Sequence, residues 1–121
     1  MAGFGNHLIR KIVISTGAVT TLAGTGSSGS ANGTGTSASF YSPTGITTDG
    51  TNLYVADTFN HLIRKIVIST GAVTTVAGTG SSGSANGTGT SASFNFPYGI
   101  TTDGTNLYVA EYGNHLIRKI E

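Results

Sequence analysis

Three histidines are the residues of this sequence whose type and spacing first suggest chemistry. His7, His61 and His115 lie 54 residues apart, and each is followed by Leu-Ile-Arg-Lys-Ile. Imidazole is a common zinc ligand, so equally spaced histidines raise the question of a metal site. Each histidine starts the same outer strand of a repeated unit, about 10 Å from the unit's inner edge at roughly 4.8 Å per strand. The copies therefore point away from one another, and we predict a structural role for them, with no metal and no cofactor.

Two aspartates, Asp49 and Asp103, also recur once per unit. Each begins an Asp-Gly-Thr-Asn turn, where a carboxylate usually accepts hydrogen bonds from backbone N–H groups. The sequence places no second carboxylate to pair with either one, and it offers no nucleophile–base pair. We predict that both aspartates are structural and that the protein is not an enzyme.

Two further motifs have ordinary explanations. Residues 24–29, Gly-Thr-Gly-Ser-Ser-Gly, match the dinucleotide fingerprint. That fingerprint presents a pyrophosphate to a helix N-terminus, and no helical period follows here, so we interpret the match as accidental. Arg64 and Lys65 are adjacent on a strand and point to opposite faces. We expect them and their copies to be scattered surface and inter-unit charges.

Composition limits the partners that the chain can bind. Only 9% of the residues are charged, the net charge is +1, and there is no cysteine. Nothing here supplies the basic field on which nucleic-acid binding depends, or suits an anionic membrane. The first residues lack the features of a signal peptide, and no apolar run approaches 18 residues. We expect a soluble chain without a targeting signal, which binds neither nucleic acid nor membrane.

The chain is one unit written twice. Residues 6–59 and 60–113 are identical at 47 of 54 positions, and 1–13 and 109–121 are two copies of one further piece. Enrichment in β-branched residues, with turn signals between, predicts four short antiparallel strands per unit at 45–48, 53–56, 61–68 and 73–77. The Gly/Ser/Thr-rich segment 24–39 has the composition of a flexible linker. It recurs letter for letter at 78–93, which argues against that reading.

The motifs Pro-x-Gly-Ile, Asp-Gly-x-Asn-Leu-Tyr-Val-Ala-Asp and Asn-His-Leu-Ile-Arg-Lys-Ile together resemble the NHL repeat. This resemblance implies a four-stranded β-propeller blade, usually six blades to a ring, and roles mostly in binding proteins or RNA, with a few enzymes. The expected fold class is an all-β propeller with two blades per chain. We divide the chain into a partial blade (1–23), a full blade with a long loop (24–77) and a partial blade (78–121). The near-identity of the repeats suggests recent amplification or an engineered fragment.

Two blades cannot cover their own apolar faces, so we expect a self-assembling homo-oligomer. Three chains would make the six blades usual in the family. A dimer of four blades or a tetramer of eight is the alternative. The chain carries one surplus copy of the third strand. We expect the copy at 7–14 to occupy its blade and the copy at 115–121 to fray, because the latter stops at Glu121, short of the apolar pair that Val67 and Ile68 supply.

The alternative function is binding of a small molecule, peptide or protein. Six of the seven mismatches between the repeats fall at the end of the long loop and in the turn before the third strand, which emerge on one face of a blade. Aromatic-rich loops on a rigid frame are typical of a binding surface, although drift in loops would give the same pattern. The candidate binding residues are Tyr41, Ser42, Thr44, Asp57, Thr58, Phe59, Asn95, Phe96, Tyr98, Glu111 and Tyr112.

Overall fold

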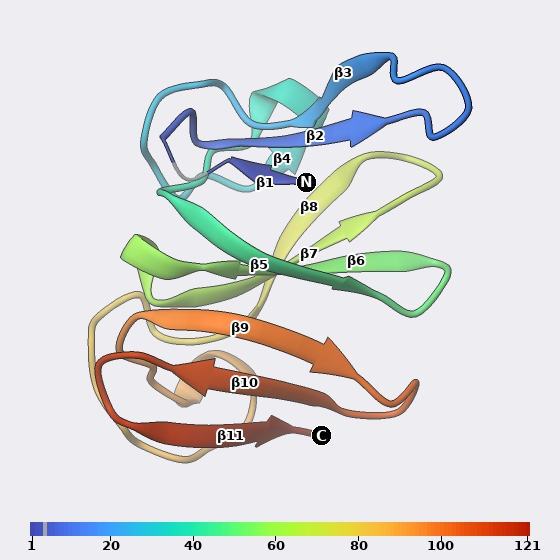
Figure 1. The fold of residues 1–121 in the computed structure, drawn as a ribbon. Coiled ribbons are helices and arrows are strands. Elements are labelled where there is room, and N and C mark those ends of the chain that lie inside the picture. Colours follow the sequence, from blue (N-terminus) through green and yellow to red (C-terminus); the bar gives the residue numbers. More distant parts are fainter. Residues whose placement is uncertain (4) are drawn as a thin grey trace.

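The computed structural model describes residues 1–3 and 5–121. Over this part of the chain the fold is all-β, with strands and three short 3-10 turns but no α-helix. No helical segment in the described residues has the length and apolar character needed to cross a membrane. The strands form three antiparallel sheets, stacked in chain order with the two termini on the outer sheets (Figure 1). The outer sheets contain β1 (Ala2–Gly3), β2 (Leu8–Ile12) and β3 (Val19–Ala23), and β9 (Pro97–Thr102), β10 (Leu107–Glu111) and β11 (Leu116–Ile120).

The middle sheet is a complete blade with the strand order β4-β8-β7-β6-β5. Its four main strands match those that the sequence predicts to within two residues at each end. They are β5 (Pro43–Thr48), β6 (Asn52–Asp57), β7 (Leu62–Val67) and β8 (Ala72–Ala77). The all-β fold of antiparallel blades is therefore confirmed.

The turn between β5 and β6 shows why the Asp-Gly-Thr-Asn motif recurs. Asp49 Oδ1 accepts hydrogen bonds from the backbone N–H groups of Thr51 (2.9 Å) and Asn52 (2.8 Å). Gly50 has φ = 94°, a left-handed conformation that favours glycine. The carboxylate and the glycine together fix the reversal of the chain between the two strands.

One strand boundary expected from the sequence is wrong, and two short strands lie where the sequence predicts none. Strand β7 begins at Leu62 and not at His61, because His61 has φ = 56° and closes a 3-10 turn (η2, Thr58–Asn60). The long loop contributes β4 (Gly33–Thr34), which pairs with β8, and residues 35–37 form the turn η1. At the amino terminus, β1 pairs with β2 in a segment for which the sequence predicts no strand.

The long loop is ordered and not a linker. Ser28 bridges to Phe40, and the N–H of Ala31 donates to Ser39 Oγ at 2.8 Å. Phe40 at the end of the loop is fully buried. A segment that reads as flexible by composition is thus held by its own hydrogen bonds and by one aromatic anchor.

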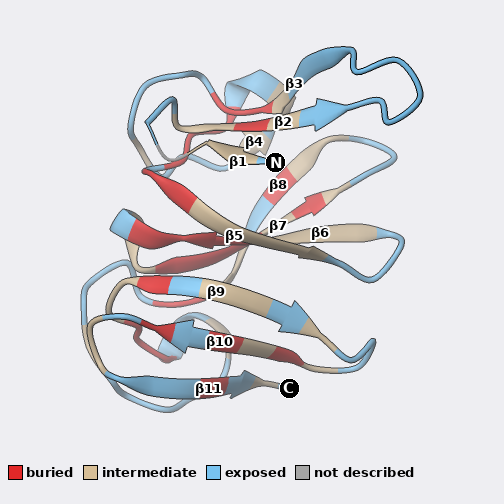
Figure 2. Cartoon of the chain, viewed as in Figure 1, coloured by how far each residue is buried: buried red, intermediate tan, exposed pale blue. Residues whose placement is uncertain are grey.

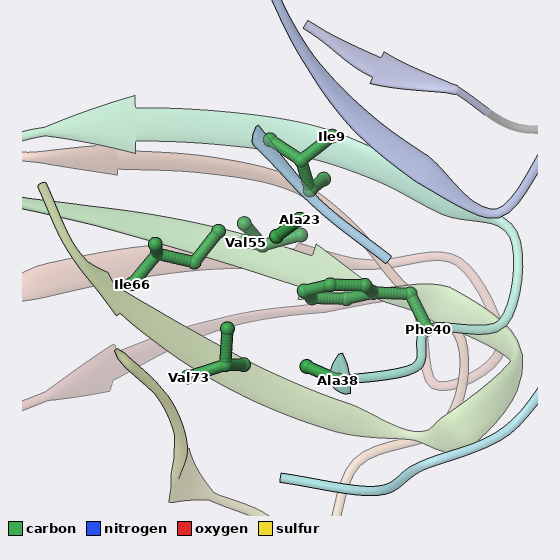
Figure 3. Packing of buried hydrophobic residues seen from close by; sticks show 7 residues of the cluster. All are labelled: Ile9, Ala23, Ala38, Phe40, Val55, Ile66 and Val73. Atoms are coloured by element: carbon green, nitrogen blue, oxygen red, sulfur yellow. The ribbon is translucent and has the colours of Figure 1, made fainter. Parts of the chain in front are cut away.

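Two apolar clusters fill the spaces between the sheets. Figure 3 shows the cluster between the first and middle sheets: Ile9, Ala23, Ala38, Phe40, Val55, Ile66 and Val73. The second cluster repeats this arrangement between the middle and third sheets with Ala56, Ile63, Ala77, Ala92, Phe94, Leu107 and Val109. Each blade therefore buries its faces only against its neighbours, and much of β11 and of β3 on the outer sheets is exposed (Figure 2).

The inner strands of neighbouring blades approach backbone to backbone. A Cβ added at Gly45 in β5 would lie 2.5 Å from the carbonyl oxygen of Tyr98 in β9. Thr44 Oγ1 donates to the same carbonyl at 2.8 Å. The glycine is thus required by close packing, and it fixes the spacing of the two blades at their inner edge.

Candidate functional site

Six of the seven pairs of residues that differ between the repeats gather at one end of the stacked sheets. We call this end the loop face and define it by residues 41–44, 57–59, 95–98 and 111–113. In the middle blade, the N–H of Phe59 donates to the carbonyl of Tyr41 at 3.1 Å. In the third blade, the N–H of Tyr112 donates to the carbonyl of Phe96 at 2.9 Å. These bonds tie each turn to the end of the loop that precedes the same blade.

A hollow of about 290 Å³ opens on the loop face between the middle and third blades. All of its lining residues are positions at which the repeats differ, and four of the five are aromatic: Thr58, Phe59, Phe96, Tyr98 and Tyr112. Its lining surface is apolar. Such a hollow suits an apolar or aromatic group and offers no charge for catalysis.

Aromatic rings run from this hollow across the loop face. Phe59 contacts Phe96 edge-on with ring centres 5.5 Å apart, and it contacts Tyr41 at 5.2 Å. His7 and His61 lie at the two ends of the row, 5.6 Å from Tyr41 and 4.8 Å from Phe96. Each such contact is worth about 0.5–1.5 kcal/mol beyond the area that it buries. The row stiffens the floor of the hollow and joins all three blades.

The histidines connect each blade to the next. His61 Nδ1 accepts a hydrogen bond from the N–H of Phe96 at 3.1 Å, and His7 Nδ1 accepts from the N–H of Ser42 at 2.9 Å. Partial burial lowers the pKa of His61 below 6.5. This favours the neutral imidazole, whose Nδ1 lone pair the hydrogen bond requires. In the described residues, no group of three or more His, Cys, Asp or Glu side chains is placed to hold a metal ion.

A buried ion pair lies beneath the exposed residues of the loop face in the middle blade. Arg64 Nη1 binds Asp57 Oδ2 at 2.8 Å, and both side chains are fully buried. Asp57 also accepts from the Asn60 amide (2.7 Å) and from the N–H of Tyr41 (2.8 Å). Burial raises the pKa of Asp57, and these two hydrogen bonds and the charge of Arg64 oppose that rise. The expectation that Arg64 is a scattered surface or inter-unit charge is therefore wrong.

Arg64 also holds the long loop in place. Its guanidinium donates to the carbonyls of Ser39 (2.8 Å) and Ala31 (2.9 Å) and to Asn32 Oδ1 (3.0 Å). It lies over the Phe40 ring at 4.9 Å. Alternation along β7 turns Arg64 towards this loop, and the loop supplies the acceptors that a buried guanidinium needs.

The third blade repeats this arrangement with glutamate in place of aspartate. Arg118 binds Glu111 at 2.9 Å and the carbonyls of Ser93 and Ala85 at 3.0 and 2.8 Å. Position 57 carries aspartate and the equivalent position 111 carries glutamate, so the substitution keeps the carboxylate. The retained charge could have indicated a structural ion pair, but the sequence-based prediction treats Asp57 and Glu111 as variable binding residues.

The predicted binding residues thus fall into two groups. Ser42, Asp57, Thr58 and Glu111 are buried, and Ser42, Asp57 and Glu111 form the inner frame of the loop face. Thr58 is also a wall of the hollow, and its hydroxyl donates to the carbonyl of Pro97 at 2.7 Å. The partly or largely exposed residues are Tyr41, Thr44, Phe59, Asn95, Phe96, Tyr98 and Tyr112.

The two aspartates of the turns lie far from this chemistry. Asp103 accepts from the N–H groups of Asn106 (2.7 Å) and Thr105 (2.9 Å) and from the Tyr108 hydroxyl (3.0 Å). These hydrogen bonds lower the pKa of Asp103 to about 2. Asp49 has the same three kinds of partner, and its pKa is lowered for the same reason. Both carboxylates hold their turns.

Stacked antiparallel blades joined by long, ordered loops define a fragment of a β-propeller. No family model matches the chain. It is 38% identical over 98 residues to NHL repeat-containing protein 2 of Bos taurus, a match that covers 77% of this chain and 14% of that protein. The chain is therefore made of NHL repeats, which form the blades of the propeller.

Solved structures agree with this assignment. A protein of unknown function from Bacteroides thetaiotaomicron superposes with a TM-score of 0.91 at 32% identity, covering 98% of this chain and 31% of that one. An auxiliary nutrient binding protein from Bacteroides ovatus superposes with a TM-score of 0.82 at 28% identity, covering 98% of this chain and 33% of that one. The chain spans about a third of each of these structures and a smaller share of the Bos taurus relative.

Proposed function

We propose that residues 1–121 are a self-assembling propeller unit, three copies of which close a ring of six blades. The observation that carries the proposal is that apolar residues exposed on the outer sheets have buried counterparts in the middle blade. Ile12 and Val19 are 47% and 45% exposed, whereas their equivalents Ile66 and Val73 are 0% and 2% exposed. Apolar surface of this kind is normally covered by a partner.

The two outer sheets are complementary halves of one blade. The third sheet contains equivalents of β5, β6 and β7, and the first sheet contains equivalents of β7 and β8. Pairing β10 of one copy with β2 of the next would complete four strands by β-augmentation. It would also place Ile12 and Val19 over Ile63 and Ala77 of the first copy, as Ile66 and Val73 lie over Ile9 and Ala23 in the first cluster.

Chain length supports three copies. The chain covers 31% and 33% of two solved structures of similar fold, so three copies contain about as much chain as one of them. A head-to-tail contact of this kind closes only when its rotation divides the circle. Two blades per copy and three copies give the usual six.

The mass of the polypeptide in solution tests the proposal. Light scattering on residues 1–121 at micromolar concentration should give about three times the chain mass of 12.2 kDa. A folded 12.2 kDa species with a cooperative melt would overturn it. A mass of twice the chain would replace the trimer with a dimer.

The hollow on the loop face favours a second activity, the binding of a small molecule or peptide. Its aromatic walls are apolar and lie where the repeats differ. A solved structure of similar fold is an auxiliary nutrient binding protein, which is in keeping with a binding role for this scaffold. This second activity does not depend on ring closure, because both walls of the hollow belong to one chain.

The repeat itself provides mild variants for testing that activity. Tyr98→Thr and Tyr112→Thr install the residues that the middle blade carries at the same positions, so the fold should tolerate them. A thermal-shift screen of sugars, aromatic compounds and short peptides should find a ligand that stabilises the wild type and not the double variant. Equal stabilisation of both proteins by every hit would exclude the hollow as the site.

A further inference from the structure

Three arginines occupy the same position in the repeated unit, and two of them lie in the same kind of cradle. Arg64 and Arg118 each bind a carboxylate from the preceding strand and two carbonyls from the preceding long loop. Each also lies about 5 Å from the phenylalanine ring that ends that loop, 4.9 Å for Arg64 and 5.0 Å for Arg118. The third copy is Arg10 in β2.

Arg10 has no cradle in its own chain. Strand β1 pairs with β2 in the register in which β10 pairs with β11, so Gly3 takes the position of Glu111. A glycine supplies no carboxylate. The Arg10 side chain makes no ion pair or hydrogen bond with any residue in 1–3 and 5–121, where the structure is described.

A second copy of the chain contains every part that Arg10 lacks. The sequence Leu-Ile-Arg-Lys-Ile of β2 is repeated in β11. Strand β10 of a second copy can therefore pair with β2 through the same five residue pairs that it makes with β11, replacing the two-residue strand β1. This pairing would bring Glu111, the carbonyls of Ser93 and Ala85, and Phe94 around Arg10.

The anchoring of the two competing strands differs. Residue Ile9 in β2 is fully buried against the middle blade, and His7 just before it accepts a hydrogen bond from Ser42. Residue Ile117 in β11, the equivalent of Ile9, is 75% exposed. Strand β2 is also joined to β3 by a turn closed by the Gly17 N–H bonding to the carbonyl of Val13 at 2.7 Å. Apart from Arg118, whose bonds Arg10 would replace, and Ile120, which packs at the edge of the second apolar cluster, β11 buries little surface, whereas β2 is held by the fully buried Ile9.

We infer that Arg10 enters the cradle of Glu111, Ser93 and Ala85 in a second copy and displaces Arg118 from it. This inference rests on the ring proposed above and identifies the residues that close it. The contact surface is specific for a second copy of this chain, because it needs both the arginine strand and the cradle. Arg118 then holds the cradle only until the neighbour arrives.

Matched arginine variants test the inference. Arg10→Met should weaken association at least about a hundredfold, because it leaves the buried carboxylate of Glu111 without its partner at the joint. Arg118→Met should leave the trimer mass unchanged. Arg10 makes no side-chain bond within the described chain, so its replacement should not unfold the single copy, which far-UV circular dichroism checks. If Arg118→Met weakens the assembly as much as Arg10→Met does, the inference is wrong.

Engineered disulfides show directly which strand pairs with β10. The chain has no cysteine of its own, so only the introduced pair can form a disulfide. Tyr108 in β10 is directly opposite Lys119 in β11, and the exchanged pairing would place Lys11 there instead. Residues opposite each other on antiparallel strands have Cα atoms about 4.5–5.5 Å apart, which a disulfide can span. After oxidation, Tyr108→Cys with Lys11→Cys should give covalent oligomers on a non-reducing gel. Tyr108→Cys with Lys119→Cys should give little cross-link.

The outcomes separate the inference from the proposal beneath it. If the wild-type protein stays at 12.2 kDa in solution, the proposed ring is wrong, whatever the variants do. The wild type can be a trimer while Tyr108→Cys with Lys119→Cys cross-links within one chain and Tyr108→Cys with Lys11→Cys does not cross-link. That result keeps the ring and overturns only the exchange of Arg118 for Arg10.

Discussion

The buried ion pair of the middle blade gives the sharpest test of what holds the fold together. Replacing Asp57 by alanine leaves the Arg64 guanidinium fully buried and without its carboxylate. It also removes one of the two acceptors of the Asn60 amide and the acceptor of the Tyr41 N–H. Breaking one side of a buried pair costs about 3–5 kcal/mol. That is a large fraction of the roughly 5–15 kcal/mol by which a domain is stable.

The chain itself offers the matched control. Asp57→Glu installs the residue found at position 111, where the glutamate binds Arg118 at 2.9 Å and accepts from the N–H of Asn95 at 2.8 Å. One added methylene in a packed site should cost about 1 kcal/mol. The ion pair would be kept.

Urea unfolding followed by circular dichroism measures both variants. Protein concentration must be the same for all samples, because assembly makes apparent stability depend on it. We expect Asp57→Ala to lose about 3–5 kcal/mol, equivalent to a fall in Tm on the order of 10–20 °C for a chain of this size. If Asp57→Ala costs no more than Asp57→Glu, the ion pair does not anchor the long loop and our reasoning about the cradle fails.

Three further predictions concern single elements. Gly45→Ala should lose about 1–3 kcal/mol in chemical unfolding, because its Cβ would lie 2.5 Å from the carbonyl oxygen of Tyr98. Gly99→Ala is the control, since the nearest atom to its Cβ would be 3.8 Å away. It should cost under about 0.5 kcal/mol in the unassembled chain. Deleting residues 115–121 removes Arg118 from Glu111, but in the proposed ring Arg10 of the next copy takes its place, so the Tm of the assembled protein should change by less than about 5 °C in calorimetry; a larger fall would show that this strand belongs to the blade. Asp103 has a folded-state pKa of about 2 against an ordinary value of 3.8, so its stabilisation is complete above pH 3.8 and is lost as the pH falls towards 2. The difference in Tm between wild type and Asp103→Asn should therefore shrink over that range, and a constant difference would contradict the assignment.

Repetition in the sequence was enough to predict most of the fold. An all-β architecture and the four strands of a blade follow from β-branched runs between turn residues, and both signals are local. The Asp-Gly-Thr-Asn turn is local too, because Asp49 bonds to N–H groups two and three residues away. The resemblance of the motifs to the NHL repeat predicted the propeller, because the strand pattern of one blade does not indicate how blades are arranged.

Tertiary structure alone decided the roles of the charged and aromatic residues. Asp57 and Arg64 lie on different strands, and the carbonyls of the long loop that complete their site are 25 and 33 residues from Arg64. The hollow on the loop face likewise combines residues of two blades. Burial depends on which blade lies against which, so identical residues such as Ile63 and Ile117 end fully buried and 75% exposed. Sequence specifies the blade, and the stacking of one blade on another determines which of its residues are core, frame or surface.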